Sequence, residues 1–191
     1  MKKILSLFFA IIAVFSVVLP ASAMSNGNAD NEIELALDNT GKAGATYGYA
    51  TYDNSTVYFN LDNADERLAF EAIQSTTNSR AVQPRLFGSI HVGIEMVGTQ
   101  YQMYYEVKGD SLLSAGGYMK CKSTALVLAT TYHDEKFVQT SLGTTLMTGE
   151  SSLFSLPSGT EKVKVGWHDV TIRHSGGYSE PSDKYATVKV G

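Results

Sequence analysis

The chain has 191 residues, a formal net charge of −4 at pH 7 and one cysteine. Its length suits one ordinary domain, or a small domain with an extension, and argues against two full ones. Its acidity argues against nucleic acid or an anionic membrane as its partner. Cys121 has no second cysteine to pair with, so an intramolecular disulfide is excluded and a hydrophobic core must hold the fold.

The N-terminus has the three parts of a secretory signal peptide. Lys2 and Lys3 precede an apolar run over residues 4–19, and Ala-Ser-Ala follows at 21–23. A membrane anchor would need about 20 apolar residues, and this run is shorter and ends at a good cleavage site. We therefore expect cleavage after Ala23, secretion of the remaining chain, and no stable membrane insertion.

The first part of the exported chain begins with a polar lead-in over residues 24–44. Two strand-like segments follow, at 45–52 and 56–61. Asp-Asn-Ser at 53–55 is favourable turn chemistry between them. The sequence therefore predicts a β-hairpin here.

Residues 64–74 change to a helical period. Asp62 or Asn63 can cap this helix, and acidic side chains in its first turn suit the positive end of the helix dipole. The polar segment at 75–84 then marks the best internal boundary. We expect residues 24–85 to form an extension and residues 86–191 to form the main domain.

The linker allows two interpretations of the N-terminal region. Residues 24–80 are an acidic propeptide removed after Arg80, or the hairpin and helix pack on the main domain as an integral extension. The aromatic and β-branched surface of residues 45–61 needs a partner, which favours the extension.

Residues 90–107 give the clearest pattern in the chain. Apolar residues alternate on both sides of Gly98–Thr99, which supplies a two-residue hairpin turn. Val97 and Gln100 flank the turn, so each residue a given number of positions before Val97 pairs with the residue the same number of positions after Gln100. This register places apolar pairs on one face and polar or small pairs on the other: Ile94–Met103, Val92–Tyr105, His91–Glu106 and Gly93–Tyr104.

Further strands are predicted along the rest of the chain, with a bulge near residues 166–169 where the inward-facing positions change parity. About seven strands in residues 86–191 match an antiparallel immunoglobulin-like β-sandwich, with a barrel as the alternative. The fold is therefore predicted to be mainly β. The additional strands are expected at 118–129, 136–142, 152–156, 162–173 and 185–190, with turns at 116–117, 133–134, 157–159 and 175–177.

Cys121 is the strongest candidate for a nucleophile. The alternation around it places the thiol on the inward face of its strand, while Lys120 and Lys122 point outward. A buried core thiol is the favoured interpretation, because a reactive cysteine must be exposed and deprotonated. We expect no catalytic residue here.

The four histidines have no spacing that forms a local metal site. His133–Asp134 and His168–Asp169 each put a histidine beside a carboxylate, but neighbours on an extended strand point to opposite faces. The sequence therefore predicts no metal and no cofactor.

Tyrosines are the best indication of function in the sequence, although the favoured interpretation of their number is that tyrosine is common in β-strands. Tyr104, Tyr132 and Tyr178 fall on outward or loop positions, and His133 and Asp134 lie at a predicted turn. A tyrosine ring gives a rigid apolar face with a hydroxyl group, which suits sugars and protein surfaces. These five residues are the predicted ligand-binding residues.

The sequence thus predicts a secreted, non-catalytic binding or interaction module for an extracellular protein or a cell-envelope glycan. One alternative is a small extracellular enzyme that uses Cys121 or a histidine–carboxylate pair. Another is a secreted effector or bacteriocin-like protein made with a propeptide.

Overall fold

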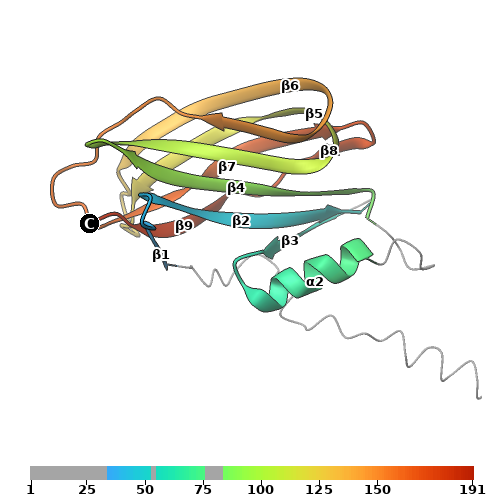
Figure 1. Cartoon of the computed structure of the whole chain (residues 1–191), viewed down its shortest axis with the longest axis horizontal. Helices are drawn as coiled ribbons and strands as arrows, with labels where there is room; N and C mark the ends of the chain where they lie inside the picture. The colour runs from blue at the N-terminus through green and yellow to red at the C-terminus, as the bar shows by residue number, and fades with distance from the viewer. Residues whose placement is uncertain (1–33, 53–54, 76–83) are drawn as a thin grey trace, which may run out of the picture. The chain divides into compact units, whose positions relative to one another are not determined.

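The computed structural model of the chain describes residues 34–52, 55–75 and 84–191 (Figure 1). The predicted signal peptide, its cleavage position after Ala23 and the predicted processing residue Arg80 lie outside these residues. Within them the chain is mainly β, with one α-helix, α2 (Ala64–Ser75). The prediction of a mainly β fold is confirmed.

The strands form one curled, mixed, hydrogen-bonded sheet (Figure 1). Only the pair β1–β9 is parallel among the described strands. An immunoglobulin-like sandwich, which has two separate sheets, is not confirmed. In spatial order the main path is β1 (Glu34–Ala36), β9 (Lys184–Lys189), β7 (Lys162–His174), β5 (Gln100–Ser123), β4 (Leu86–Val97), β2 (Lys42–Thr51) and β3 (Thr56–Asn60), while β6 (Thr131–Glu150) pairs with β5 and β8 (Gly177–Ser179) pairs with β7.

The length of β5 produces the curl. β4 pairs with one edge of β5 as far as Gly109, and β7 takes over that same edge from Leu112, while β6 follows the other edge. Ser111, between these two stretches, has a φ of 50°. The sheet turns over at this point, so that Tyr47 of β2 meets Trp167 of β7 edge-on, with 5.2 Å between ring centroids.

The register of the β4–β5 hairpin is confirmed. Each predicted pair is present, from Val97–Gln100 onward. One face is buried almost completely because its apolar side chains enter the core, and a Cβ on Gly93 would collide with the Tyr104 ring that covers it. The buried side chains on this face are Ile90, Val92, Ile94, Met103, Tyr105 and Val107.

Two predicted turns are wrong. Gly116 and Gly117 lie inside β5, where a Cβ on Gly117 would contact Val170 of β7, so glycine permits close packing of strands rather than chain reversal. Residues 133–134 lie inside β6, where they pair in register with β5.

Two predicted strands are also corrected. The segment 118–129 leaves the sheet after Ser123, because its last residues form the connection to β6. The segment 152–156 contributes only an isolated bridge, between Phe154 and Tyr101. The predictions for β7 and β9 agree with the structure within one residue at each end.

The predicted bulge in β7 is confirmed at Asp169. The register with β5 shifts between His168 and Thr171, and Asp169 has a φ of 51°. Val163, Val165 and Trp167 face the core before the bulge, and the buried positions after it have the opposite parity.

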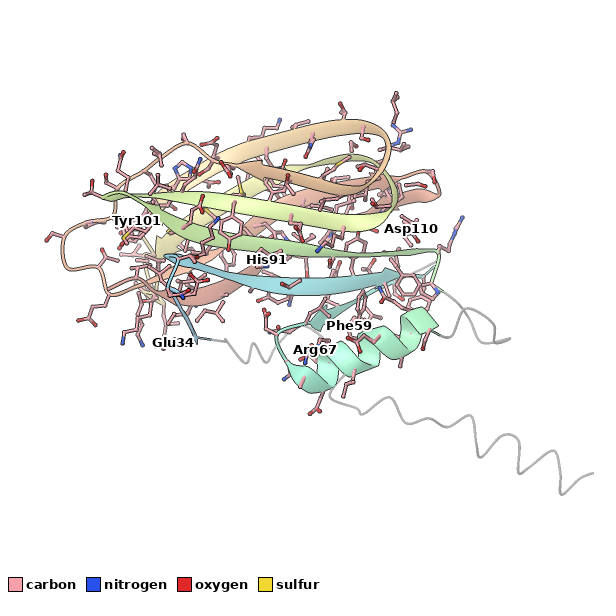
Figure 2. All side chains as sticks on the ribbon, viewed as in Figure 1. Glu34, Phe59, Arg67, His91, Tyr101 and Asp110 are labelled. Atoms are coloured by element: carbon pink, nitrogen blue, oxygen red, sulfur yellow. The ribbon has the colours of Figure 1, made fainter. Side chains whose placement is uncertain are left out.

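Helix α2 begins where the sequence predicts. Asn63 caps it, since its Oδ1 accepts hydrogen bonds from the backbone N–H groups of Asp65 (3.0 Å) and Glu66 (3.2 Å). Phe70 anchors the helix against Phe59 of β3, with 5.4 Å between ring centroids (Figure 2). The helix thus covers an outer part of the sheet beside β3.

The predicted hairpin at 45–61 is present as β2 and β3. β2 also pairs with β4 over ten residues, so its backbone lies within the sheet rather than beside it. Its Tyr49 is 1 % exposed and belongs to the main core. The hairpin is therefore part of the same sheet as the later strands.

Candidate functional site

The structure separates the predicted binding residues. Tyr104 lies on β5, Tyr132 and the pair at 133–134 lie on β6, and Tyr178 lies on β8. They do not converge on one cavity, so each is considered in its own surroundings.

The Tyr104 ring is in contact with other residues of the protein. Its ring covers Gly93, lies 5.4 Å from the His91 ring, and has the Lys42 ammonium 5.3 Å from its centroid. It borders an open groove of about 600 Å³ together with Glu106 and other residues. Because these neighbours occupy the ring, Tyr104 is a poor platform for stacking a ligand.

His91 does not use the partner that the register suggests. Its Nδ1 lies 2.8 Å from Thr46 Oγ1 and its Nε2 lies 3.4 Å from Tyr104 Oη, whereas Glu106 pairs with Lys108. Burial lowers the pKa of His91, which favours the neutral ring. His91 is a structural residue between β2 and β5.

Tyr132 and His133 lie close to the core. Tyr132 is half-buried and borders a shallow groove beside the loop at 158–161. His133 stacks on Phe154, with 4.4 Å between ring centroids and an interplanar angle of 5°. Neither side chain is free to enclose a ligand.

Asp134 faces the opposite side of β6 from His133 and belongs to a surface cluster that was not predicted from the sequence. Its Oδ1 accepts a hydrogen bond from His168 Nε2 (2.9 Å), and its Oδ2 pairs with Lys120 Nζ (2.9 Å). His168 also donates from Nδ1 to Asp169 Oδ2 (2.9 Å) and stacks on Tyr118 at 4.8 Å. The expectation that His168 and Asp169 point apart is wrong, because the bulge at Asp169 turns both side chains to one side.

This cluster favours the protonated, cationic form of His168. Both of its ring nitrogens face carboxylates, which accept but do not donate, so each nitrogen carries a proton. Burial opposes this charge, but Asp134 and Asp169 outweigh it and raise the pKa of His168 above its ordinary value.

The ion pair predicts a pH-dependent stability. Because the pKa of His168 is higher in the folded than in the unfolded protein, its protonation stabilises the fold fully below the ordinary histidine pKa. This stabilisation is lost as the pH rises through the folded-state pKa. We expect His168→Asn to cost about 0.5–1 kcal/mol at pH 6 and less at pH 9. Urea unfolding of both proteins at the two pH values measures this difference, and equal costs at both would contradict the ion-pair role.

Cys121 is buried, as predicted. It is 0 % exposed and packs within the main core. Burial raises the pKa of its thiol to about 12, so the thiolate needed for nucleophilic attack is absent near neutral pH. An enzyme based on Cys121 therefore has no support.

His174 is also used internally. Its Nδ1–H donates to the Asp110 carbonyl (3.0 Å), which leaves Nε2 to accept from the Tyr49 hydroxyl (3.0 Å). Its side chain is 3 % exposed. This buried series of hydrogen bonds connects Tyr49 of β2, through His174, to β5 next to Ser111, where the sheet turns over.

Tyr178 has the open surroundings that a binding residue requires. It is 65 % exposed on the short strand β8, directly opposite Arg173 of β7. The two border a groove of about 600 Å³ on the outer side of the sheet. Arg173 and Glu180, both exposed, were not predicted as site residues; their nearness to the Ser-Gly-Gly turn at 175–177 is the only sequence signal for them. The rest of the lining includes Leu113, Ser114, Thr171 and Ser175.

The chain matches no family model, no curated protein and no solved structure. Within residues 34–52, 55–75 and 84–191, no helix is long and apolar enough to cross a membrane. Over the same residues, no group of three or more His, Cys, Asp or Glu side chains is placed to hold a metal ion. The arrangement of the side chains around Tyr178 is therefore the basis for a functional proposal.

Proposed function

We propose that this protein is exported after cleavage behind Ala23 and acts outside the cytoplasm as a non-catalytic module that binds a cell-envelope glycan. The observation that carries the proposal is the exposed ring of Tyr178 beside Arg173 and Glu180 in an open groove. The immunoglobulin-like sandwich is not needed for this function.

The groove has the chemistry that sugar recognition uses. A pyranose ring has an apolar face that stacks on an aromatic side chain, while its hydroxyl groups need donors and acceptors around the edge. Tyr178 supplies the aromatic face, Arg173 supplies donors, and the Glu180 carboxylate supplies an acceptor. Ser114 and Thr171 add hydroxyl groups along the same lining.

The arrangement favours binding over catalysis. Glycoside hydrolysis needs two carboxyl groups on opposite sides of the scissile bond, and Glu180 is the one carboxylate among the described residues that line this groove. His174 borders the groove, but both of its nitrogens are engaged by Tyr49 and Asp110. The groove therefore offers a place to hold a ligand and no evident pair of groups to transform it.

Binding to purified cell-wall glycan tests the proposal. We expect Tyr178→Ala to weaken binding in a sedimentation assay by about tenfold or more, and Tyr178→Trp to retain it. Leu68→Ala is the matched control, because Leu68 is similarly exposed (62 %) on helix α2, none of whose residues line the groove. Equal binding by wild type and Tyr178→Ala would contradict this site.

The same variants separate a glycan from a protein ligand. Binding that survives complete enzymatic digestion of the glycan but is lost after protease treatment of the envelope would replace the glycan with a protein partner. Export is checked separately, by N-terminal sequencing of the secreted product, which should begin at Met24.

A further inference from the structure

Strand β6 has a long edge with no strand beside it. Within residues 34–52, 55–75 and 84–191, β6 pairs only with β5, so its other edge is open. β6 spans 20 residues, whereas the strands at the two ends of the sheet path, β1 and β3, have three and five. An open edge presents backbone donors and acceptors that can pair with another strand.

The outward backbone groups of the last part of β6 belong to even-numbered residues. In an antiparallel pair, alternate residues bond to the neighbouring strand and the residues between them face outward. Just after β6, the Ser151 N–H donates to the Met103 carbonyl of β5 (2.8 Å), so odd-numbered residues bond to β5 here. Leu146 agrees, since its carbonyl and its N–H lie 3.0 and 3.3 Å from the Thr144 hydroxyl of its own strand. The outward residues of this part are Leu146, Thr148 and Glu150.

β6 bends back on itself at its middle, together with β5 (Figure 1). Gly149, in its last part, pairs in register with Tyr105 of β5. Its first part lies across the core from the same tyrosine. The Phe137 ring is 4.3 Å from that of Tyr105 between centroids, and Gln139 Oε1 accepts a hydrogen bond from the Tyr105 hydroxyl (3.2 Å). Gly143 lies between the two parts and has a φ of 105°.

The first part of β6 has the same parity. Along one strand, residues whose side chains share a face also direct their backbone groups to the same side. Phe137 and Met147 both face the core, and both lie in register with β5. Odd-numbered residues therefore face β5 in both parts, and the outward residues of the first part are Lys136, Val138 and Thr140.

The edge lacks most of the features that prevent strand pairing. Proteins usually protect such an edge with charged side chains or proline, but residues 137–149 contain neither. The bend at Gly143 is the interruption that it does have. Val138 is 67 % exposed beside this edge. The charged β5 residues in register with residues 137–149 are Glu106 and Lys108, which pair with each other (2.6 Å).

Opposite charges stand at the two ends of this uncharged segment. Lys136 precedes it and Glu150 follows it, and both side chains are exposed. Neither forms an ion pair with another described residue. Glu150 helps to raise the pKa of Lys42, but the ion pair of Lys42 is with Glu95. Both end charges are therefore available to another chain.

We propose that a second copy of this chain pairs with β6 edge to edge, antiparallel, about a two-fold axis at Gly143. With this axis, Lys136 lies opposite Glu150 of the second copy, and the symmetry repeats the ion pair on the other side of the axis. The occupant is thus chosen by charge complementarity, since β6 carries both halves of the pair. An unrelated strand would have to supply the matching charges at the same spacing.

The pairs between the two charges also suit each other. Val138 lies opposite Thr148 of the second copy, and Thr140 lies opposite Leu146. All four are outward residues, so each pair can exchange backbone hydrogen bonds. Apolar and threonine side chains then face each other across the new pair of strands.

The neighbouring registers lose the ion pairs. Outward residues pair only with outward residues, so the register can shift only in steps of two residues. A step in one direction places Asp134 opposite Glu150, and like charges in that position are unfavourable. A step in the other direction places Val138 opposite Glu150 and Lys136 opposite Ser152, which leaves both charges without a partner.

The bend at Gly143 fits this symmetry. Because the axis passes through the bend, the first part of β6 in each copy pairs with the last part of β6 in the other. Both layers of the curled sheet then continue into the second copy, and the open edge is closed on both chains. None of the residues that line the Tyr178 groove is on β6, so the dimer goes beyond glycan binding and uses a different surface.

Sedimentation velocity of the secreted chain over a range of concentrations tests the proposal. We expect the wild type to sediment as a dimer at micromolar concentrations. Lys136→Glu and Glu150→Lys should each raise the dimer dissociation constant about tenfold or more, because like charges then face each other twice. The double variant Lys136→Glu, Glu150→Lys returns opposite charges to the same positions and should dimerise like the wild type.

A matched pair of variants tests the edge itself. Val138→Lys places a lysine on the pairing edge and should weaken the dimer about tenfold or more. Leu68→Lys is the control, because Leu68 is similarly exposed (62 %) on α2 and should leave the dimer unchanged. Circular dichroism should show the same fold for every variant. Tyr178→Ala should also dimerise normally, which separates failure of this proposal from failure of the glycan proposal.

Amide hydrogen exchange gives the second readout. The outward N–H groups of Val138, Thr140 and Thr148 should exchange more slowly in the wild type than in Lys136→Glu at the same concentration. A wild type that remains monomeric at about 0.1 mM would overturn the proposal. A dimer that tolerates Val138→Lys, or charge variants that the double exchange does not rescue, would overturn it as well.

Discussion

A chain that begins at residue 81 is expected not to fold. It lacks β2 and β3, and β2 supplies ten register pairs to β4. It also lacks Tyr49 and Phe59, which are among the largest fully buried side chains of the protein. Each is worth about 2–3 kcal/mol of apolar burial, and each backbone hydrogen bond adds about 1 kcal/mol. These lost contacts are large against the net stability of an ordinary domain, which is about 5–15 kcal/mol.

The truncation would also expose β4. Ile90, Val92 and Ile94 would lose their neighbours on β2, and the freed edge of β4 would present unpaired backbone groups to other chains. We therefore expect aggregation rather than a soluble domain.

Circular dichroism and urea unfolding of the two chains measure this effect. The control is a chain that begins at Met24, which should give a cooperative transition. A cooperative transition in the chain that begins at residue 81 would contradict the prediction. It would also revive the simple propeptide interpretation, in which residues 24–80 are removed and lost.

The same reasoning constrains the effector alternative. If a protease cuts after Arg80, we expect the N-terminal fragment to remain attached through its pairing with β4. Gel filtration after such a cut should then give one peak containing both fragments. Separation of the fragments with retained β structure would favour a true propeptide.

The sequence predicts the β4–β5 hairpin because several signals agree there. Apolar alternation, a glycine in the turn and sensible pairs on both faces all require one register. The bulge at Asp169 is predictable for a similar reason, because the inward-facing positions of one strand change parity only where an extra residue interrupts the alternation.

Long-range geometry limits what the sequence predicts elsewhere. Gly116 and Gly117 look like a turn, but the space beside Gly117 is filled by Val170, about fifty residues away in the chain, and Gly116 lies against Phe137 and Val138 of β6. Residues 125–129 continue the alternation of β5, so no local pattern shows that the strand stops at Ser123. Apolar composition alone does not distinguish a buried strand from an exposed loop.

The candidate site is predictable only in part. The position of Tyr178 between turns indicates an exposed ring, but its neighbours Arg173 and Glu180 come together through the β7–β8 pairing. Tyr104 has the same apparent exposure in the sequence, and its ring proves to be occupied by His91 and Lys42. Cross-strand neighbours decide which tyrosine remains available, and those neighbours depend on the whole sheet.

Trp167→Ala is expected to lower the free energy of unfolding by about 3–5 kcal/mol. The indole is 1 % exposed and packs edge-on against Tyr47 from the opposing part of the sheet. Its Nε1–H donates to the Ser182 carbonyl (3.2 Å), which ties β7 to the segment before β9. Alanine would leave a cavity at the point where the curled sheet meets itself, and the rigid strands on both sides limit collapse.

Trp167→Phe separates packing from hydrogen bonding. Phenylalanine keeps an aromatic ring against Tyr47 but removes the donor to Ser182, so the expected cost is smaller, about 1–3 kcal/mol. Urea unfolding followed by circular dichroism measures both variants, because fluorescence is lost with the only tryptophan of the chain. A cost below about 1 kcal/mol for Trp167→Ala would show that the two parts of the sheet do not pack through this ring. The curl at Ser111 would then have to be maintained by the β5 backbone and its hydrogen bonds alone.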